Sequence, residues 1–177
     1  DAGTNIQFYT KADGVNQGTA PTRAMVIAST GQVRFEDGSV SLPSISNSGD
    51  TNTGIFFPAA DTIAFAEGGS EAARINSDGK LLIGSDTSGR ASLLQVHTPA
   101  SGGGDSILLT RDDTNTDQQV GSINFGNNSD SDLGLISVKT DGAANTGAML
   151  FSSAVGGTTA ERLRISSTGT VLVATGS

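Results

Sequence analysis

Few side chains in this sequence could carry nucleophilic chemistry. There is one histidine, His97, and there is no cysteine. A serine nucleophile needs a neighbouring base, and His97 is the only imidazole that could supply it. Because His97 follows the apolar run Leu93–Val96 and precedes Thr98-Pro99, we expect it at a strand end on the surface. Three copies of His97 around a symmetry axis could bind an ion, but we expect no metal site and no catalytic residue.

Two loops are rich in the oxygen ligands that calcium prefers. They are Asp112-Asp113-Thr114-Asn115-Thr116-Asp117 and Asn128-Ser129-Asp130-Ser131-Asp132. Neither has the glycine and the distal glutamate of an EF-hand loop. Solvated turns are the better interpretation of both.

Paired carboxylates could hydrolyse glycans, but glutamates are scarce, and they are Glu36, Glu67, Glu71 and Glu161. Glu71 and Glu161 each lie shortly before an arginine of a repeated motif, so they fit a structural role. Aromatic residues, which could stack on sugars, make up only 5% of the chain. The glycine runs 68–69 and 102–104 lack the strand, helix and Lys-Ser/Thr of a phosphate-binding loop. We therefore expect no enzyme and no cofactor.

The charge and hydropathy patterns narrow the classes of partner. The net charge is −8, and lysine and arginine form no cluster, which argues against nucleic acid and anionic membrane surfaces as partners. No apolar run approaches the roughly 20 residues of a membrane-spanning helix. The sequence opens Asp1-Ala2-Gly3-Thr4, without methionine or a leader pattern, so we expect a segment of a longer protein.

Composition predicts an all-β protein with little or no helix. Glycine accounts for 24 of 177 residues, about twice the usual 7%. Apolar residues come in short clusters separated by Gly, Ser, Asn and Asp, as in strands joined by tight turns. Low hydrophobicity would also fit disorder, but these clusters recur at matched positions, which disorder does not require.

The main organising signal is a repeated hairpin. In three stretches, an isoleucine is followed four residues later by glycine and two residues after that by valine or leucine. The stretches are Arg23–Val33, Arg74–Leu81 and Arg162–Val171. Such a loop usually needs one residue at positive φ, which glycine adopts without strain. We therefore predict Gly31, Gly79 and Gly169 as turn residues.

Apolar residues alternate with polar ones along the flanking strands, so one face of each hairpin is apolar. A lone hairpin is marginally stable in water. Neighbouring repeats and copies of the chain around a threefold axis could cover the apolar faces and pair open edges. We therefore predict a homotrimer, with these core candidates: Ile27, Val33, Ile75, Leu81, Ile83, Leu163, Ile165, Val171 and Val173. Of the adjacent pair Phe56-Phe57, the outward side chain is a further candidate for a contact between chains.

The repeats divide the chain into four predicted segments. They are an N-terminal β-repeat at 1–46, a second at 47–90, a β insert at 91–146 and a third repeat at 147–177. Within the insert, apolar clusters predict strands at 93–96, 106–109, 122–125 and 133–138. The best helix candidate, Ser70–Arg74, is too short to stand alone.

Several stretches resemble known protein modules. The stretch Ser48–Ile75 resembles a module of bacteriophage tail fibres, especially those of marine phages and cyanophages, and Glu161–Gly169 resembles its closing motif. The stretches Ile107–Asp113 and Val120–Gly126 resemble another piece of such fibres. The first motif is specific, and together the motifs cover most of the chain from about residue 41. Nothing in the sequence resembles the self-cleaving chaperone domain that ends many relatives.

The resemblance implies an elongated homotrimeric fibre, with a β-prism or β-helix-like architecture, in the phage tail. Its partners would be other virion tail proteins and a glycan or protein of the host surface, and it would act outside the cell in host attachment. Two alternatives remain, a tailspike that depolymerises polysaccharide and a capsid or virion decoration without a receptor role. The receptor-binding residues are not identifiable from the sequence.

Overall fold

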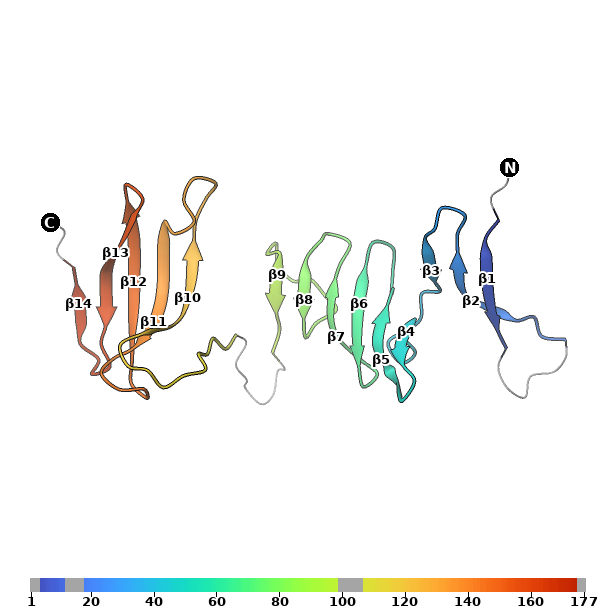
Figure 1. The fold of residues 1–177 in the computed structure, drawn as a ribbon, viewed down its shortest axis with the longest axis horizontal. Coiled ribbons are helices and arrows are strands. Elements are labelled where there is room, and N and C mark those ends of the chain that lie inside the picture. The colour runs from blue at the N-terminus through green and yellow to red at the C-terminus, as the bar shows by residue number, and fades with distance from the viewer. Residues whose placement is uncertain (1–3, 12–17, 99–106, 175–177) are drawn as a thin grey trace. The chain divides into compact units, whose positions relative to one another are not determined.

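The computed structural model describes residues 4–11, 18–98 and 107–174. These residues form fourteen β-strands and no helix, which confirms the predicted all-β class. The helix candidate 70–74 lies in a strand. The chain divides into two compact units, Asp1–Ser106 and Ile107–Ser177. The first unit contains two sheets and the second contains one (Figure 1).

The first sheet is a three-stranded antiparallel meander in the order β1-β2-β3. Its strands are β1 (Ile6–Thr10), β2 (Thr22–Ile27) and β3 (Val33–Phe35). Ile6, Ile27 and Val33 lie side by side across the three strands. The repeat 23–33 therefore forms the hairpin that its glycine spacing predicts.

The second sheet has six strands in the order β4-β5-β6-β7-β8-β9. They are β4 (Ile45–Asn47), β5 (Asp50–Phe56), β6 (Ile63–Glu67), β7 (Ser70–Ile75), β8 (Leu81–Ile83) and β9 (Leu94–Val96). All neighbours are antiparallel except β8 and β9, which are parallel. At Gly54 a Cβ atom would lie 2.0 Å from the carbonyl oxygen of Ile45, so only glycine lets β4 approach β5 here.

The third sheet has five antiparallel strands in the order β10-β11-β12-β13-β14. They are β10 (Gln119–Phe125), β11 (Gly134–Thr140), β12 (Gly147–Val155), β13 (Thr158–Ile165) and β14 (Val171–Val173). Consecutive strands are always neighbours, so every connection is a hairpin. Such local pairing needs only short turns.

The three repeated hairpins share one turn geometry. Gly31, Gly79 and Gly169 have φ of 85°, 75° and 82°, the left-handed conformation for which the spacing predicts glycine. In each turn the glycine N–H donates to the carbonyl three residues earlier, at 2.8, 2.8 and 3.0 Å. The residue that provides this carbonyl donates its own N–H across the turn to the residue after the glycine. The repeated sequence thus encodes one repeated backbone conformation.

Each repeat also carries a β-bulge that its sequence did not indicate. The register shifts by one residue beside Phe8, Phe65 and Phe151, which leaves Ala24, Ala72 and Arg162 as the extra residues. The carbonyl of each extra residue accepts an N–H from the residue that follows the third strand of its repeat, namely Glu36, Gly84 and Ala174. The repeat is therefore a three-stranded unit, in which the apolar strand that the sequence places before each hairpin pairs with it, and its internal geometry is the same in all three copies.

A strap of chain between β8 and β9 covers one face of the second sheet. Because β9 runs parallel to β8, residues 84–93 must cross over a face of the sheet. The side-chain amide of Gln95 donates to the Ser88 hydroxyl and to the carbonyls of Arg90 and Ser92, at 2.9 to 3.0 Å. Leu82 is paired with Gln95 in register and is fully buried.

Two features differ from the sequence prediction. Residues 107–109 form no strand, although a strand was predicted at 106–109, and residue 106 lies outside the described residues. The apolar triplet Ile107–Leu109 instead precedes a loop that Arg111 holds in place. The sheets also group the chain differently from the four segments, since β4 pairs with β5 and β9 pairs with β8. From 119 onward, the predicted insert and third repeat share one sheet, because β11 pairs with β12.

Replacing Gly79 tests the turn. A Cβ at Gly79 would meet nothing within 4 Å, so Gly79→Ala adds only backbone strain at φ 75°. We expect a loss of about 1 kcal/mol in the free energy of unfolding, measured by urea denaturation at fixed protein concentration. The matched control is Gly89→Ala, which also has open space but no positive φ, and should change stability by less than about 0.5 kcal/mol. Equal losses in both variants would contradict the proposed strain.

Candidate functional site: the apolar sheet faces

The second sheet has one continuous apolar face. Side chains alternate between the two faces along each strand, and the register aligns the apolar ones across all six strands. Two rows on this face contain no charged residue; the first spans β6 to β9 and the second spans all six strands. One row is Ile63, Ile75, Leu81 and Leu94, and the other is Ile45, Ile55, Phe65, Ala73, Ile83 and Val96.

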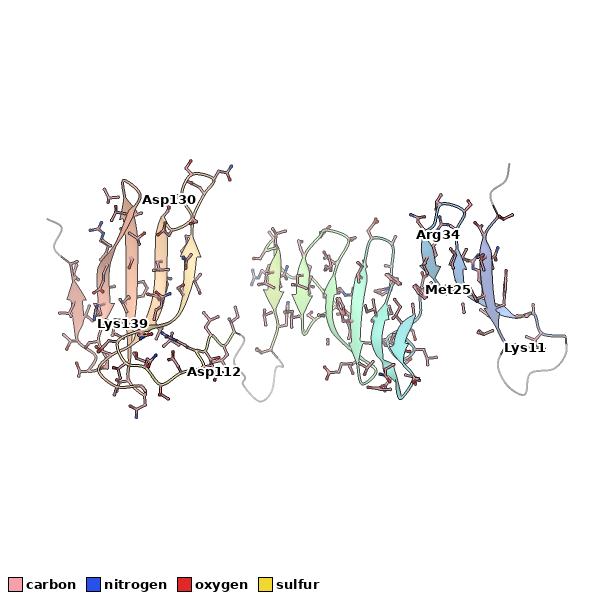
Figure 2. All side chains as sticks on the ribbon, in the orientation of Figure 1. Lys11, Met25, Arg34, Asp112, Asp130 and Lys139 are labelled. Carbon is pink, nitrogen blue, oxygen red and sulfur yellow. The ribbon has the colours of Figure 1, made fainter. Side chains whose placement is uncertain are left out.

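The first sheet repeats this arrangement on a smaller scale. Its apolar face consists of the register-aligned residues Ile6, Phe8, Met25, Ile27, Val33 and Phe35. Arg34 and its partner Val26 lie on the opposite face. Figure 2 labels Met25 on β2 and Arg34 on the neighbouring strand β3. The charged side chain of Arg34 is thus kept off the apolar face.

The third sheet has the same pattern across five strands. Its apolar face consists of Ile123, Phe125, Ile136, Val138, Met149, Phe151, Leu163, Ile165, Val171 and Val173. Arg164 pairs with Leu150 and Leu172 on the opposite face. We call these three surfaces the apolar faces.

Little in the described chain covers the apolar faces. Most of their large side chains are exposed, from 37% for Val138 to 70% for Val173. Among residues 4–11, 18–98 and 107–174, seven apolar residues are buried, and four of these are alanines. The larger buried residues Val26, Phe56 and Leu82 all lie on the opposite faces. The described chain therefore buries a thin layer on one side of the sheets and leaves the other side exposed to solvent.

The opposite face of the second sheet is covered by loops of the same chain. Phe56, Ala64 and Ala66 form a small buried cluster, against which Val40 packs. The loop that carries Val40 is tied down by the bond from the Phe57 N–H to the Asp37 carbonyl, at 2.8 Å. Loops cover this face, whereas the described residues leave most of the large side chains of the apolar face exposed.

All nine predicted core candidates lie on the apolar faces. Five phenylalanines share these faces, namely Phe8, Phe35, Phe65, Phe125 and Phe151. Their simplest interpretation from the sequence is already as core and interface residues, because each lies two residues from an apolar residue in the same strand. Of the Phe56-Phe57 pair, Phe56 is buried on the covered face and Phe57 is half-buried beyond the end of β5.

The side chains that could carry out chemistry do not come together at one site. His97 is exposed just after β9, where its backbone N–H donates to the Ile83 carbonyl at 2.9 Å. Glu71 and Glu161 form ion pairs with Arg74 and Arg164 three residues later, with N–O distances of 2.5 and 2.7 Å. The Arg164 guanidinium lowers the pKa of Glu161 below its usual value.

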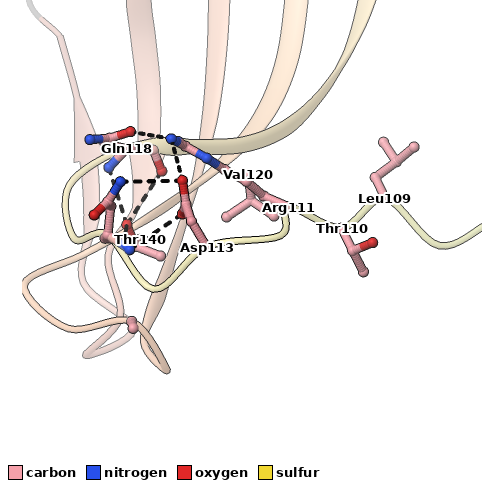
Figure 3. A pocket seen from close by; sticks show the side chains of 9 residues that line it. Leu109, Thr110, Arg111, Asp113, Gln118, Val120 and Thr140 are labelled. Atoms are coloured by element: carbon pink, nitrogen blue, oxygen red, sulfur yellow. Dashed lines mark hydrogen bonds and ion pairs between the residues drawn. The ribbon is translucent and has the colours of Figure 1, made fainter.

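The first acidic loop is held by its own contacts. Asp113 pairs with Arg111 at 2.7 Å, and Arg111 also donates to Gln118 and to the Gln119 carbonyl (Figure 3). The hollow that they line has a volume of about 180 Å³. Because Arg111 and Asp113 neutralise each other, this hollow offers no free charged group.

The second acidic loop is tied to its own backbone and to β13. Asp132 accepts a hydrogen bond from the Thr159 hydroxyl at 2.8 Å, and its N–H donates to Asp130 at 3.1 Å. Side-chain hydrogen bonds with Asp130 and Thr159 lower the pKa of Asp132. Within residues 4–11, 18–98 and 107–174, no three His, Asp or Glu side chains gather in a way that could hold a metal ion.

Comparisons with known proteins add no relative. No family model matches the chain, and no curated protein or solved structure shows significant similarity. In the part of the chain that the structure describes, no helix is long and apolar enough to cross a membrane.

Asp141 provides a pH-dependent test of the third hairpin. Its carboxylate accepts the N–H and the hydroxyl of Ser167 at 3.0 and 2.8 Å, and these bonds lower the pKa of Asp141 from 3.8. A lowered folded pKa stabilises the fold above the unfolded value, and this stability is lost as pH falls through the folded pKa.

In an NMR titration, we expect Asp141 to titrate below 3.8. Ser167→Ala removes the hydroxyl but keeps the hydrogen bond from the backbone N–H. It should therefore raise the pKa of Asp141 part of the way toward its usual value. Thr114→Ala, at an exposed loop position, is the control and should leave this pKa unchanged. An Asp141 pKa that does not respond to Ser167→Ala would show that the hydroxyl bond does not form in solution.

Proposed function

We propose that this protein is a segment of a phage tail fibre, assembled as a homotrimer, which presents receptor-binding loops to the host cell surface. The observation that carries the proposal is the exposure of one continuous apolar face on each of three sheets. Monomeric proteins rarely expose contiguous apolar patches of this kind. In a homotrimer, each apolar face of one chain would pack against the same face of the other two chains, so all three faces would be covered.

The lengths of the central strands of the second sheet suit a three-sided prism. Packed sheets lie about 10 Å apart, so each wall supplies about 5 Å of side chain. In a triangular prism, the distance from each wall to the central axis is about 0.29 of the wall width. A wall that supplies about 5 Å of side chain therefore fills the interior when it is about 17 Å wide, which is about five residues of a strand. The central strands β6 and β7 have five and six residues. Three chains with such strands could meet at an axis without leaving a channel, in an elongated β-prism.

The phage assignment rests on the sequence resemblance of 48–75 and 161–169 to tail-fibre modules. In the proposed prism, the apolar faces point inward, and the ion pairs, straps and acidic loops point outward. Each outward loop is then displayed three times, so weak contacts to a host glycan or protein gain strength through effective concentration. Other virion tail proteins would hold the fibre, and its place of action would be outside the cell.

We propose that this role involves no catalysis. Glu71 and Glu161 are neutralised by arginines, and His97 and the two acidic loops serve separate local contacts. A glycosidase needs two carboxylates close together across a sugar. The release of oligosaccharide from host capsule by the purified chain would favour a depolymerase instead.

Light scattering tests the assembly. We expect a mass near three chains for the wild type. Ile75→Glu places a charge in the apolar face and should reduce the mass toward one chain, because burying an unpaired carboxylate is costly. Ser77→Glu introduces the same residue at an exposed turn position of the same hairpin and should leave the trimer intact. A wild-type chain that stays folded as a monomer would contradict the proposal.

Attachment to cells tests the receptor role. We expect the fluorescently labelled wild-type chain to bind saturably to a susceptible strain in a panel of bacteria, as measured by flow cytometry. Ile75→Glu should reduce binding at least tenfold, because loss of the trimer removes the gain from multivalency. Ser77→Glu should retain binding. A trimer that binds no strain in the panel would instead favour a fibre without a receptor role.

A further inference from the structure

The third strands of the three repeats carry different residues at one equivalent position. Arg34, Leu82 and Leu172 each lie in the middle of a three-residue strand, on the face opposite the apolar face. Register places them across from Val26, Arg74 and Arg164 in the preceding strands. The bulge hydrogen bond follows two residues later in all three repeats. The three positions can therefore be compared directly.

In the second sheet, the outer edge of this third strand is occupied. The N–H of Leu81 donates to the Leu93 carbonyl at 2.7 Å, and the Ile83 carbonyl accepts the His97 N–H at 2.9 Å. The strand β9 thus adds to β8 in parallel, and the strap 84–93 crosses above Leu82. Leu82 is 0% exposed as a result.

In the first sheet, the equivalent edge is guarded by charge. Arg34 replaces the buried leucine, and its guanidinium donates to Gln32 at 2.8 Å. Charged side chains on an edge strand discourage the addition of another strand. The first sheet therefore has no apolar side chain at this position that a strap would need to cover.

In the third sheet, no described strand pairs with the outer edge of β14, and the strand itself carries no charged side chain. The sheet order ends at β14, and Leu172 is 51% exposed. Val171 and Val173, on the other face of the same strand, are 60% and 70% exposed. A terminal strand with apolar side chains on both faces is a template for strand addition.

We propose that the free edge of β14 is a docking site for a parallel β-strand of the kind that β9 supplies to β8. The occupant would be an extended segment with an apolar residue, a glutamine and an apolar residue, preceded by a small polar strap. The Val171 N–H and the Val173 carbonyl correspond to the Leu81 N–H and the Ile83 carbonyl, which bind the residues just before and just after β9. The apolar pair would add to the apolar face, and the glutamine would hold the strap over Leu172.

A synthetic peptide with the sequence of residues 84–97 tests the site. We expect the labelled peptide to bind the full chain saturably by fluorescence anisotropy, and to slow hydrogen exchange at the Val171 amide. Leu172→Arg copies the residue of the first sheet and should weaken binding at least tenfold. Leu172→Ser, which keeps a neutral side chain, should weaken it less. A peptide with Gln95 replaced by alanine should bind more weakly than the parent peptide.

Two outcomes would overturn the proposal. The peptide could exchange with the chain's own β9, in which case the added protection appears at Leu81 and Leu172→Arg has no effect. Alternatively, β14 edges of two copies could pair, which light scattering would detect as association beyond the trimer that the peptide does not reverse. The site does not depend on the trimer, so Ile75→Glu should still bind the peptide at β14.

Discussion

In each sheet, the alternation of side chains along hairpin strands places the bulky apolar residues on one face, and the described chain provides no second layer to cover it. Loops and straps cover the opposite faces, where alanines and single residues such as Phe56 and Leu82 are buried. At roughly 1.5–3 kcal/mol for each large side chain buried, the exposed faces hold most of the stabilisation available to this sequence. The fold is therefore most stable when the apolar faces meet another surface.

The hydrogen bonds and ion pairs of the opposite faces position the strands rather than build a site. Glu71–Arg74 and Glu161–Arg164 occupy equivalent places beside a bulge, and each pair is partly exposed. Exposed pairs contribute little to stability. Their geometry instead keeps the glutamate and arginine on the face away from the apolar residues, so the charged groups would not obstruct packing between copies.

Much of the fold follows from local sequence. The glycine spacing and the apolar alternation of 162–165 predict the hairpins, because both depend on backbone conformation within a few residues. The bulges at Ala24, Ala72 and Arg162 were not predictable in this way, since a bulge is defined by the partner strand. The same holds for β9, whose parallel pairing depends on Gln95 binding a strap several residues upstream. The apolar residues of the candidate surface follow from the same local alternation, whereas their alignment into continuous faces required the register across strands.

The comparison of Arg34, Leu82 and Leu172 separates two demands on a repeated β-unit. The apolar face is preserved in all three repeats, whereas the edge residue varies with what lies next to it. The position holds an arginine in the first sheet, a leucine buried under a strap where the second sheet continues, and an exposed leucine in the third sheet, where no described strand follows β14. The turn and the bulge stay the same in the three units, so the residue at this position and the segment that follows it are what differ between a sheet that continues and one that does not. In a fibre made of such units, this one position would decide where one sheet stops and the next begins.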